Sequence, residues 1–287
     1  MNLKVLQRAD IDKVKWNSCV HYAEKGNPFG YLWFLDNISK DWFGIIEDDY
    51  HSVMPVFLET NFWGNTIFKS PNLLPFYQLY TVNALSHKRV DAFLELAMKQ
   101  VKKLNIQQAF FKPQDVSFRT PQVNKQELIT VDLSPNYTKV LNNLHPDLQA
   151  LEHNIELDKY LLNSIKIEEA SEAMASIHKL KKSDKFALMR LFYNAQQRQL
   201  GQVFALKDDT GHLLAVDFFF FSHGKMISFL PSSSKRGQAI QAEGIITTRL
   251  FKRFSGQPLR YYRNNHSLLP KQMSTDQFAL DVFSIKH

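Results

Sequence analysis

One local pattern occurs twice in this chain, about half a chain apart, and it constrains the fold more than any other feature. Residues 43–57 and residues 203–218 each contain an apolar, β-prone run, a short link that begins with two aspartates, and a second apolar run. Asp accepts hydrogen bonds from its own backbone and tolerates tight turns, so each segment predicts a β-hairpin.

The elements expected after the two hairpins also correspond. After the first hairpin we expect a helix over residues 86–104 and a short strand over residues 108–111. After the second we expect a strand, a polar loop, a helix and a strand over residues 226–230, 231–236, 237–254 and 259–262. The order hairpin, helix, strand therefore recurs, which predicts two similar α/β domains.

Length and composition agree with two folded domains. The chain has 287 residues, of which 44% are hydrophobic and 13% aromatic, enough to fill the cores of two domains of ordinary size. We expect an N-terminal domain over residues 1–134, a helical connection over residues 135–160, and a C-terminal domain over residues 161–287. The predicted fold class is α/β (α+β), and each domain is expected to hold a mixed, largely antiparallel sheet flanked by helices.

The remaining elements follow from periodicity and from capping residues. We expect Asp10 to cap a helix that runs to residue 24, and the four-phenylalanine run at residues 218–221 to lie in a central strand buried on both faces. Further strands are expected over residues 3–6, 66–70, 126–133 and 163–167, and further helices over residues 31–38, 169–180 and 186–200.

Several classes of protein are disfavoured. The longest apolar run, residues 213–221, is interrupted by Asp217 and is too short to span a membrane. The N-terminus turns polar too early for a secretory signal, so we expect a cytoplasmic protein. The single cysteine, Cys19, excludes an internal disulfide and is expected to be a small buried residue, and no metal site is predicted. A net charge of +7 favours polyanionic partners such as nucleic acid, nucleotide phosphates or an anionic membrane face.

The order of elements resembles the GNAT acyltransferase fold, and two such domains in one chain resemble the Fem family of aminoacyl transferases and its bacterial relatives. Trp16, residues 26–29 and Trp33 are similar to the N-terminal pattern of that family, and residues 50–55 to its following strand. The resemblance implies sheets that splay open to admit an acyl donor. It also implies an acyl-CoA or an aminoacyl-tRNA as donor, and a small-molecule or peptide amine as acceptor.

The resemblance places a donor-binding segment at Lys235, Arg236, Gly237 and Gln238. GNAT enzymes carry glycines here that let the backbone approach a pyrophosphate at a helix N-terminus. In this sequence, Ala239 stands where a glycine is required, and Gln241 stands where a small residue is required. We therefore expect weak coenzyme A binding or none, a departure that favours a tRNA-borne donor. The alternative interpretation is a polar loop that only caps the helix.

Glu243 is the principal catalytic candidate. At 100° per residue it lies near the middle of the apolar face of the expected helix, while Arg249, Lys252 and Arg253 lie on the other side. A buried carboxylate needs a partner or a proton. Glu243 is therefore either a general base for an attacking amine or a structural acid paired with an Arg, Lys or Tyr, with Tyr261 and Tyr262 as nearby partners.

The strand after this helix provides the other candidates. Tyr261, Tyr262 and Arg263 end that strand, where a splayed sheet would present side chains to the acyl or leaving group, and Tyr262 is the second catalytic candidate. Relatives often carry an acidic turn with Gly and Ser next, whereas this chain has Arg263 followed by two asparagines, His266 and Ser267. That difference indicates an altered acceptor site or a loss of activity.

Three functions are compatible with the sequence. The first is an acyl or aminoacyl transferase that joins an activated carboxyl group to an amine. The second is the same fold without chemistry, acting as a ligand-binding or partner-binding protein. The third is a tRNA or RNA binder, which would need basic residues interleaved with exposed aromatics, and the sequence spacing does not show such a stripe.

Overall fold

The computed structural model describes residues 1–60, 64–109, 122–264 and 278–286. The chain forms two compact units. Unit 1 consists of residues 1–126 and 279–287, and unit 2 of residues 127–278. Within the described residues, no helix is both long and apolar enough to cross a membrane.

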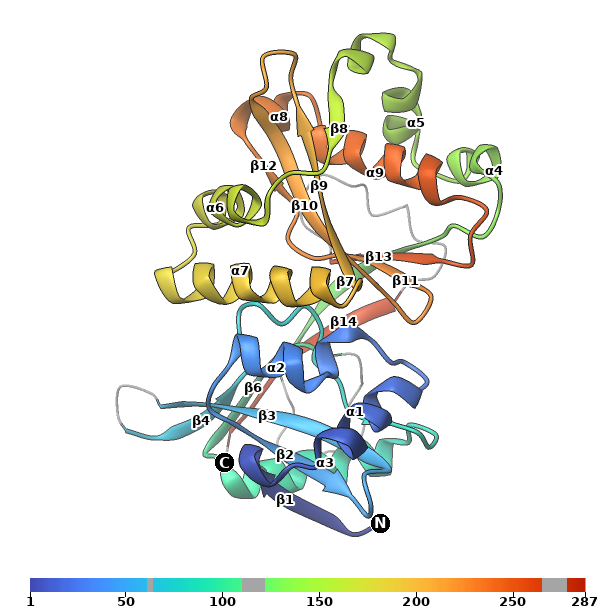
Figure 1. The fold of residues 1–287 in the computed structure, drawn as a ribbon. Helices are drawn as coiled ribbons and strands as arrows, with labels where there is room; N and C mark the ends of the chain where they lie inside the picture. Colours follow the sequence, from blue (N-terminus) through green and yellow to red (C-terminus); the bar gives the residue numbers. More distant parts are fainter. Residues whose placement is uncertain (61–63, 110–121, 265–277, 287) are drawn as a thin grey trace. The chain divides into compact units, whose positions relative to one another are not determined.

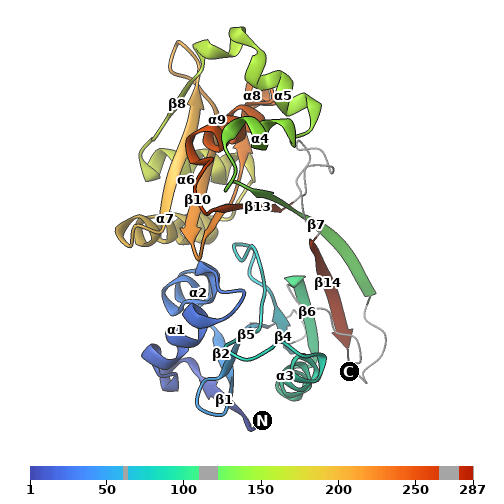
Figure 2. The same ribbon diagram turned by 90° about the vertical axis from the view of Figure 1, so that its right-hand side faces the viewer.

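Unit 1 contains a mixed sheet of six main strands in the order β1-β2-β3-β4-β6-β14. Successive neighbours are antiparallel except β4 and β6, which are parallel. The C-terminal strand β14 lies beside β6, as Figure 2 shows. The strands are β1 (Leu3–Gln7), β2 (Trp42–Glu47), β3 (Ser52–Thr60), β4 (Thr66–Lys69), β5 (Tyr80–Thr81), β6 (Lys103–Ala109) and β14 (Phe278–Lys286).

Unit 2 repeats this arrangement in the order β8-β9-β10-β11-β13-β7. Here too each neighbouring pair is antiparallel except one, β11 and β13. A two-residue strand pairs with the start of the third strand in both units, β5 with β3 and β12 with β10. The strands are β7 (Gln122–Asp132), β8 (Leu161–Asn163), β9 (Gly201–Lys207), β10 (Leu213–Ser222), β11 (Lys225–Ser228), β12 (Ser232–Ser233) and β13 (Arg260–Asn264).

Helices flank the sheets, and in unit 2 helix α9 crosses the sheet face that carries β9 and β10 (Figure 1). Short 3-10 turns occur at Arg8–Asp10, Pro28–Gly30 and Ile155–Lys159. The helices are α1 (Lys13–Tyr22), α2 (Leu32–Ile38), α3 (His87–Gln100), α4 (Tyr137–Asn142), α5 (Pro146–His153), α6 (Ile167–Ile177), α7 (Lys182–Gln197), α8 (Lys235–Ala239) and α9 (Ala242–Phe254). The expected mixed α/β class and the repeated order of elements are confirmed.

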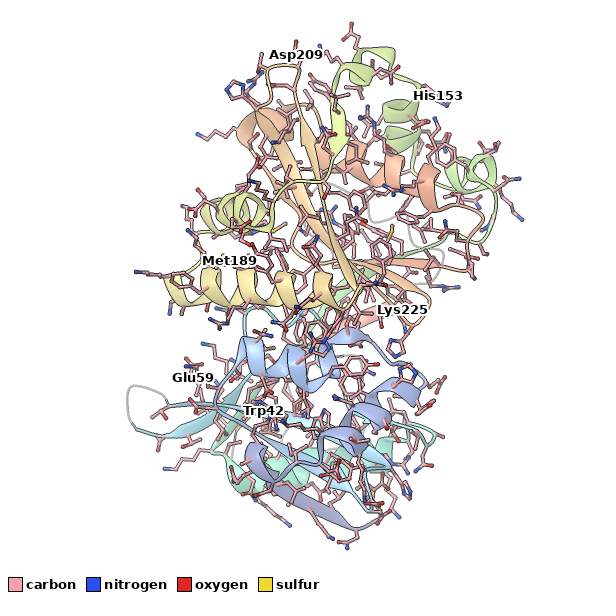
Figure 3. The ribbon with its side chains drawn as sticks, viewed as in Figure 1. Trp42, Glu59, His153, Met189, Asp209 and Lys225 are labelled. Carbon is pink, nitrogen blue, oxygen red and sulfur yellow. The ribbon has the colours of Figure 1, made fainter. Side chains whose placement is uncertain are left out.

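The two Asp-containing links form hairpin turns, as predicted. In the first, Glu47 pairs with Ser52 across the turn, and Asp48 and Tyr50 adopt positive φ angles of 51° and 65°. In the second, the Asp208 carboxylate accepts hydrogen bonds from the backbone N–H groups of Thr210 and His212 at 3.1 and 2.8 Å. Figure 3 shows Asp209 at the tip of this hairpin and Lys225 at the opposite end of β10.

Several expected elements differ from the structure. The strand expected over residues 108–111 begins earlier, as β6 from Lys103, and residues 110–111 lie outside the described residues. The cap of α1 is Asp12 rather than Asp10, because Asp12 accepts from the N–H groups of Val14 and Lys15. The helix expected to reach residue 104 ends at Gln100, and Leu104 belongs to β6. The strand expected over residues 163–167 is wrong, since β8 ends at Asn163 and Ile167 starts α6. The helix expected over residues 237–254 is broken, because Gln241 adopts the left-handed conformation (φ 54°) between α8 and α9.

The core of unit 2 lies between α9 and the sheet, with α4 and α5 covering the outer side of α9. Strand β10 is buried on both faces, as the phenylalanine run predicted. Phe219 faces the α9 side and packs with Phe204, whereas Phe218 stacks on Phe192 of α7 at 3.9 Å between ring centroids. Side chains alternate along a strand, so Asp217 shares the α9 side with Phe219.

Candidate functional site

Glu243 lies in the first turn of α9 and is 8% exposed. Its Oε1 atom accepts a hydrogen bond from the Ser233 hydroxyl at 2.9 Å, and its Oε2 atom accepts one from the Arg263 guanidinium. The first turn also places a carboxylate near the positive end of the helix dipole. The expected burial of Glu243 and its pairing with a basic residue are confirmed, and the partner is Arg263 rather than Tyr261 or Tyr262.

Arg263 is a buried cation on β13, with only 2% of its side chain exposed. Burial opposes a charged guanidinium, but the electrostatic interactions with Tyr261, Glu243 and Asp217 outweigh that effect and raise the pKa of Arg263. Arg263 is therefore a permanent positive charge in the core of unit 2. Its burial is tolerated because carboxylates surround it.

Asp217 is a second buried carboxyl group in the same region, and it is 3% exposed. It accepts hydrogen bonds from the Ser228 hydroxyl and from the Leu230 backbone N–H, the latter at 3.1 Å. Burial raises the pKa of Asp217 to about 7, although the Ser228 hydrogen bond and the charge of Arg263 oppose the rise. Asp217 can therefore gain or lose a proton near neutral pH, a property common among catalytic acids and bases.

These side chains gather where two parallel strands separate. Strands β11 and β13 pair at only three positions, the last of which joins Ile227 to Tyr262. At the next position Ser228 still pairs with Phe219 on β10, and Arg263 pairs with Ile129 on β7. Unit 2 therefore has a divergence between β11 and β13 with polar side chains on both sides. We call Asp217, Ser228, Ser233, Glu243, Tyr261 and Arg263 the divergence cluster.

Tyr261 is part of the same buried polar region. Burial raises the pKa of its hydroxyl, and hydrogen-bonding interactions with the Arg263 and Thr247 side chains oppose the rise. Tyr261 is fully buried, and its ring packs edge-on against Phe251 at 4.9 Å between centroids. Buried polar groups in native proteins are nearly always hydrogen-bonded, and Tyr261 accordingly interacts with Arg263 on its own strand and with Thr247 on α9.

The predicted donor-binding segment occupies α8 and is already engaged. Arg236 Nη1 lies 3.1 Å from the Asp208 carboxylate, and the Gly237 N–H donates to the Ser234 hydroxyl at 3.1 Å. A Cβ atom at Gly237 would lie 2.0 Å from the Leu214 carbonyl oxygen. The glycine thus permits close packing of α8 on β10, and Gln238 likewise donates to the Ser233 carbonyl. These contacts do not favour pyrophosphate binding by this segment.

The other predicted residues lie apart from the divergence cluster. Tyr262 points to the opposite face of β13 from Tyr261 and Arg263, because side chains alternate along a strand. Glu243 and Tyr262 are therefore not brought together. His266 lies outside the described residues.

The sequence analysis considered Asp217 only as a break in an apolar run. A single carboxylate in the otherwise apolar run of residues 213–221 was the signal that could have identified it as a candidate site residue.

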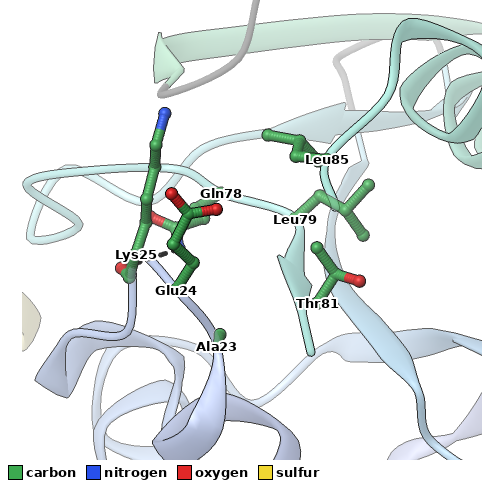
Figure 4. A pocket seen from close by; sticks show the side chains of 7 residues that line it. All are labelled: Ala23, Glu24, Lys25, Gln78, Leu79, Thr81 and Leu85. Atoms are coloured by element: carbon green, nitrogen blue, oxygen red, sulfur yellow. Dashed lines mark hydrogen bonds between the residues drawn. The ribbon is translucent and has the colours of Figure 1, made fainter. Parts of the chain in front are cut away.

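Unit 1 contains a partly buried ion pair and a small pocket. Arg89 Nε donates to the Glu47 carboxylate at 2.8 Å, which joins α3 to the end of β2. The pocket is lined by residues including Lys25, Gln78 and Thr81, and the Gln78 side-chain amide donates to the Lys25 carbonyl (Figure 4). Its volume is about 20 Å³, room for about one water molecule. It is too small to hold a substrate.

No protein-family model and no curated protein matches this sequence. Solved structures do match its fold. FemX aligns with a TM-score of 0.61 and 8% identity, over 100% of this chain and 98% of that protein. L-PGS from Bacillus licheniformis aligns with a TM-score of 0.55 and 12% identity, over 96% of this chain and 92% of that protein. A tandem GNAT protein from the clavulanic acid biosynthesis pathway aligns with a TM-score of 0.52 and 8% identity, over 100% of this chain and 98% of that protein. The chain therefore has the tandem GNAT fold found in these Fem-like and acyltransferase structures.

Proposed function

We propose that this protein is an acyl or aminoacyl transferase that joins an activated acyl group to an amine at the divergence of β11 and β13. The observation that carries the proposal is the divergence cluster, in which two carboxyl groups and one guanidinium are buried together. Such a concentration of buried charge is costly to fold. The similarity of fold to FemX and to a tandem GNAT protein supports the same class of reaction.

In the proposed reaction the amine nitrogen attacks the acyl carbonyl carbon, loses a proton, and displaces the leaving group of the donor. Asp217 is the proton acceptor, because a base with a pKa near 7 combines a useful ionised fraction with useful basicity at neutral pH. Ser228 donates to Asp217 and is the first residue of β11 beyond its pairing with β13. The Ser228 hydroxyl therefore connects the divergence with the Asp217 carboxylate.

Glu243 has a positioning role in this proposal. Its two carboxylate oxygens are engaged by Ser233 and Arg263, so it fixes the guanidinium at the divergence. The donor is an acyl-CoA or an aminoacyl-tRNA, and the acceptor is a small-molecule or peptide amine. The contacts made by Arg236 and Gly237 favour a donor that does not depend on pyrophosphate binding at α8.

A transfer assay with a matched pair of variants tests the proposal. The protein is incubated with acyl-CoA or aminoacyl-tRNA donors and a panel of amines, and products are identified by the added acyl mass. Asp217→Asn should abolish transfer, whereas Asp209→Asn, at the exposed hairpin tip, should leave it unchanged. Absence of transfer by the wild type with every donor, or equal transfer by both variants, would contradict the proposal.

A further inference from the structure

The divergence cluster is held together by side chains from five elements of unit 2. Asp217 on β10 accepts a hydrogen bond from Ser228 on β11. Glu243 on α9 accepts from Arg263 on β13 and from Ser233 on β12. Strand β12 in turn pairs with β10 next to Asp217. Two carboxyl groups and one guanidinium are therefore fixed at definite positions around the divergence.

Arg263 serves both carboxyl groups of the cluster. Its guanidinium bonds directly to Glu243 and interacts electrostatically with Asp217. Tyr261 adds no charge at neutral pH, because burial raises the pKa of its hydroxyl. The ion pair of Arg263 and Glu243 is neutral as a whole, so ionisation of Asp217 leaves one net negative charge in the core. The cost of that charge depends on how Glu243 and Asp217 share the guanidinium.

The groups around Asp217 act on it in opposite directions. Ser228 and the Leu230 N–H donate to its carboxylate and favour the ionised form. The positive charge of Arg263 also favours the ionised form, whereas the negative charge of Glu243 disfavours it. The two partners of one ion pair therefore have opposite effects on a third group.

We propose that Arg263 and Glu243 are positioning residues that set, in opposite directions, the pH above which Asp217 accepts the proton of the attacking amine. This inference rests on the proposed function, in which Asp217 is the proton acceptor. Neither residue needs to touch the amine or the acyl group, because both act through Asp217.

The balance between the two charges suits a base that works near neutral pH. Without the guanidinium, burial alone would keep Asp217 protonated, and it could not accept a proton. Without Glu243, the unshared guanidinium would make Asp217 a strong acid and a poor base. A purely structural ion pair has no such effect, since its loss would lower stability without changing the titration of Asp217.

Arg263→Gln and Glu243→Gln test the inference through the titration of Asp217, followed by NMR of protein with carboxyl-labelled aspartate. The Asp217 signal is the one that Asp217→Asn removes, and its wild-type midpoint should lie near pH 7. Arg263→Gln should raise the midpoint by at least about one pH unit, and Glu243→Gln should lower it by a similar amount. In the transfer assay, the inflection of kcat/KM should move with the midpoint.

Three further variants complete the test. Arg263→Lys keeps the charge and should keep the midpoint closer to the wild-type value than Arg263→Gln does. Asp209→Asn removes a charge at the exposed hairpin tip and should leave the midpoint unchanged. The double variant Glu243→Gln/Arg263→Gln leaves no unpaired charge of this pair, so it serves where a single variant does not fold. Its midpoint should lie above that of the wild type, because Arg263 acts on Asp217 more strongly than Glu243 does.

The outcomes separate this inference from the proposed function. Midpoints that stay at the wild-type value, or that move in the same direction in both single variants, would overturn the inference and leave the proposed function intact. A double variant that titrates at or below the wild-type midpoint would also overturn it. A wild type that transfers no acyl group to any amine would overturn the proposed function and the inference together.

Discussion

Arg263 on β13 and Glu243 in the first turn of α9 form a buried ion pair in unit 2. The pair joins the helix to the strand at the point where β13 leaves β11. Because Glu243 also accepts from Ser233 on β12, a single carboxylate holds three elements around the divergence. The geometry of the proposed site therefore depends on an interaction that also contributes to folding.

Loss of this ion pair should destabilise unit 2. Glu243→Gln keeps the shape of the side chain but removes the carboxylate that pairs directly with the buried Arg263, and we expect a loss of about 3–5 kcal/mol in the free energy of unfolding. Urea unfolding of the wild type and the variant measures this loss. Replacing Glu243 and Arg263 together by apolar residues should recover part of it.

The exposed ion pair between Lys15 and Asp49 is the matched control for Glu243→Gln. Its side chains are 47% and 71% exposed, so solvent screens the interaction and Asp49→Asn should leave unfolding unchanged within error. A Glu243→Gln protein as stable as the wild type would show that the ion pair is not structural. If that protein also lost transfer activity, Glu243 itself would be the better candidate for the general base.

The stability of the protein should depend on pH through Asp217. The pKa of this carboxyl is raised from 3.8 to about 7 on folding, so the folded state binds the proton more tightly than the unfolded state does. The contribution is therefore fully present below pH 4, is lost as the pH rises to 7, and is constant above 7. The total loss is on the order of 4 kcal/mol.

Asp217→Asn isolates this contribution because an amide can keep the hydrogen bonds from Ser228 and Leu230 without titrating. The difference in free energy of unfolding between the variant and the wild type should grow in favour of the variant from pH 4 to pH 7. Denaturant titrations at several pH values measure it. A difference that is independent of pH would show that Asp217 keeps an ordinary pKa.

Acetyl-coenzyme A should not bind with micromolar affinity at α8. The Asp208 carboxylate already holds Arg236, and Ser234 already accepts from the Gly237 N–H. The backbone at Gly237 also packs against the Leu214 carbonyl, so close packing of α8 on β10 accounts for this glycine without a phosphate contact. Isothermal titration calorimetry decides the question. Micromolar binding that Arg236→Ala abolishes would mean that these contacts open for the ligand.

The parts of the fold that sequence predicts well are those set by local pattern. The repeat of hairpin, helix and strand reflects alternating apolar runs and Asp-containing turns, which act over a few residues. The burial of Glu243 followed from the angular separation of Arg249, Lys252 and Arg253 from the apolar face of α9. Each of these features depends on the residues of a single hairpin or helix, so the local sequence is enough to predict it.

The wrong predictions of element boundaries share a physical cause. Contacts with other parts of the fold determined the structure there, against the conformation that the local sequence favours. Val101 and Leu104 continue the apolar spacing of α3, but Leu104 is taken into β6 beside Phe68 of β4. Gln241 gives no sign of the left-handed conformation that ends α8, since Gly or Asn usually occupies such positions. The partners of Glu243 and Asp217 come from other strands, and no local pattern contains them.

The central claim is that the divergence cluster performs acyl transfer, and the pH dependence of the transfer rate tests it most directly. With a base of pKa about 7 at Asp217, kcat/KM for the wild type should rise about tenfold per pH unit below 7 and level off above it. The Asp217→Asn protein should lose this rise of kcat/KM with pH, together with most of the rate. A wild-type rate without an inflection near pH 7, or an Asp217→Asn protein that keeps the wild-type profile, would contradict the assignment of the active site to this cluster.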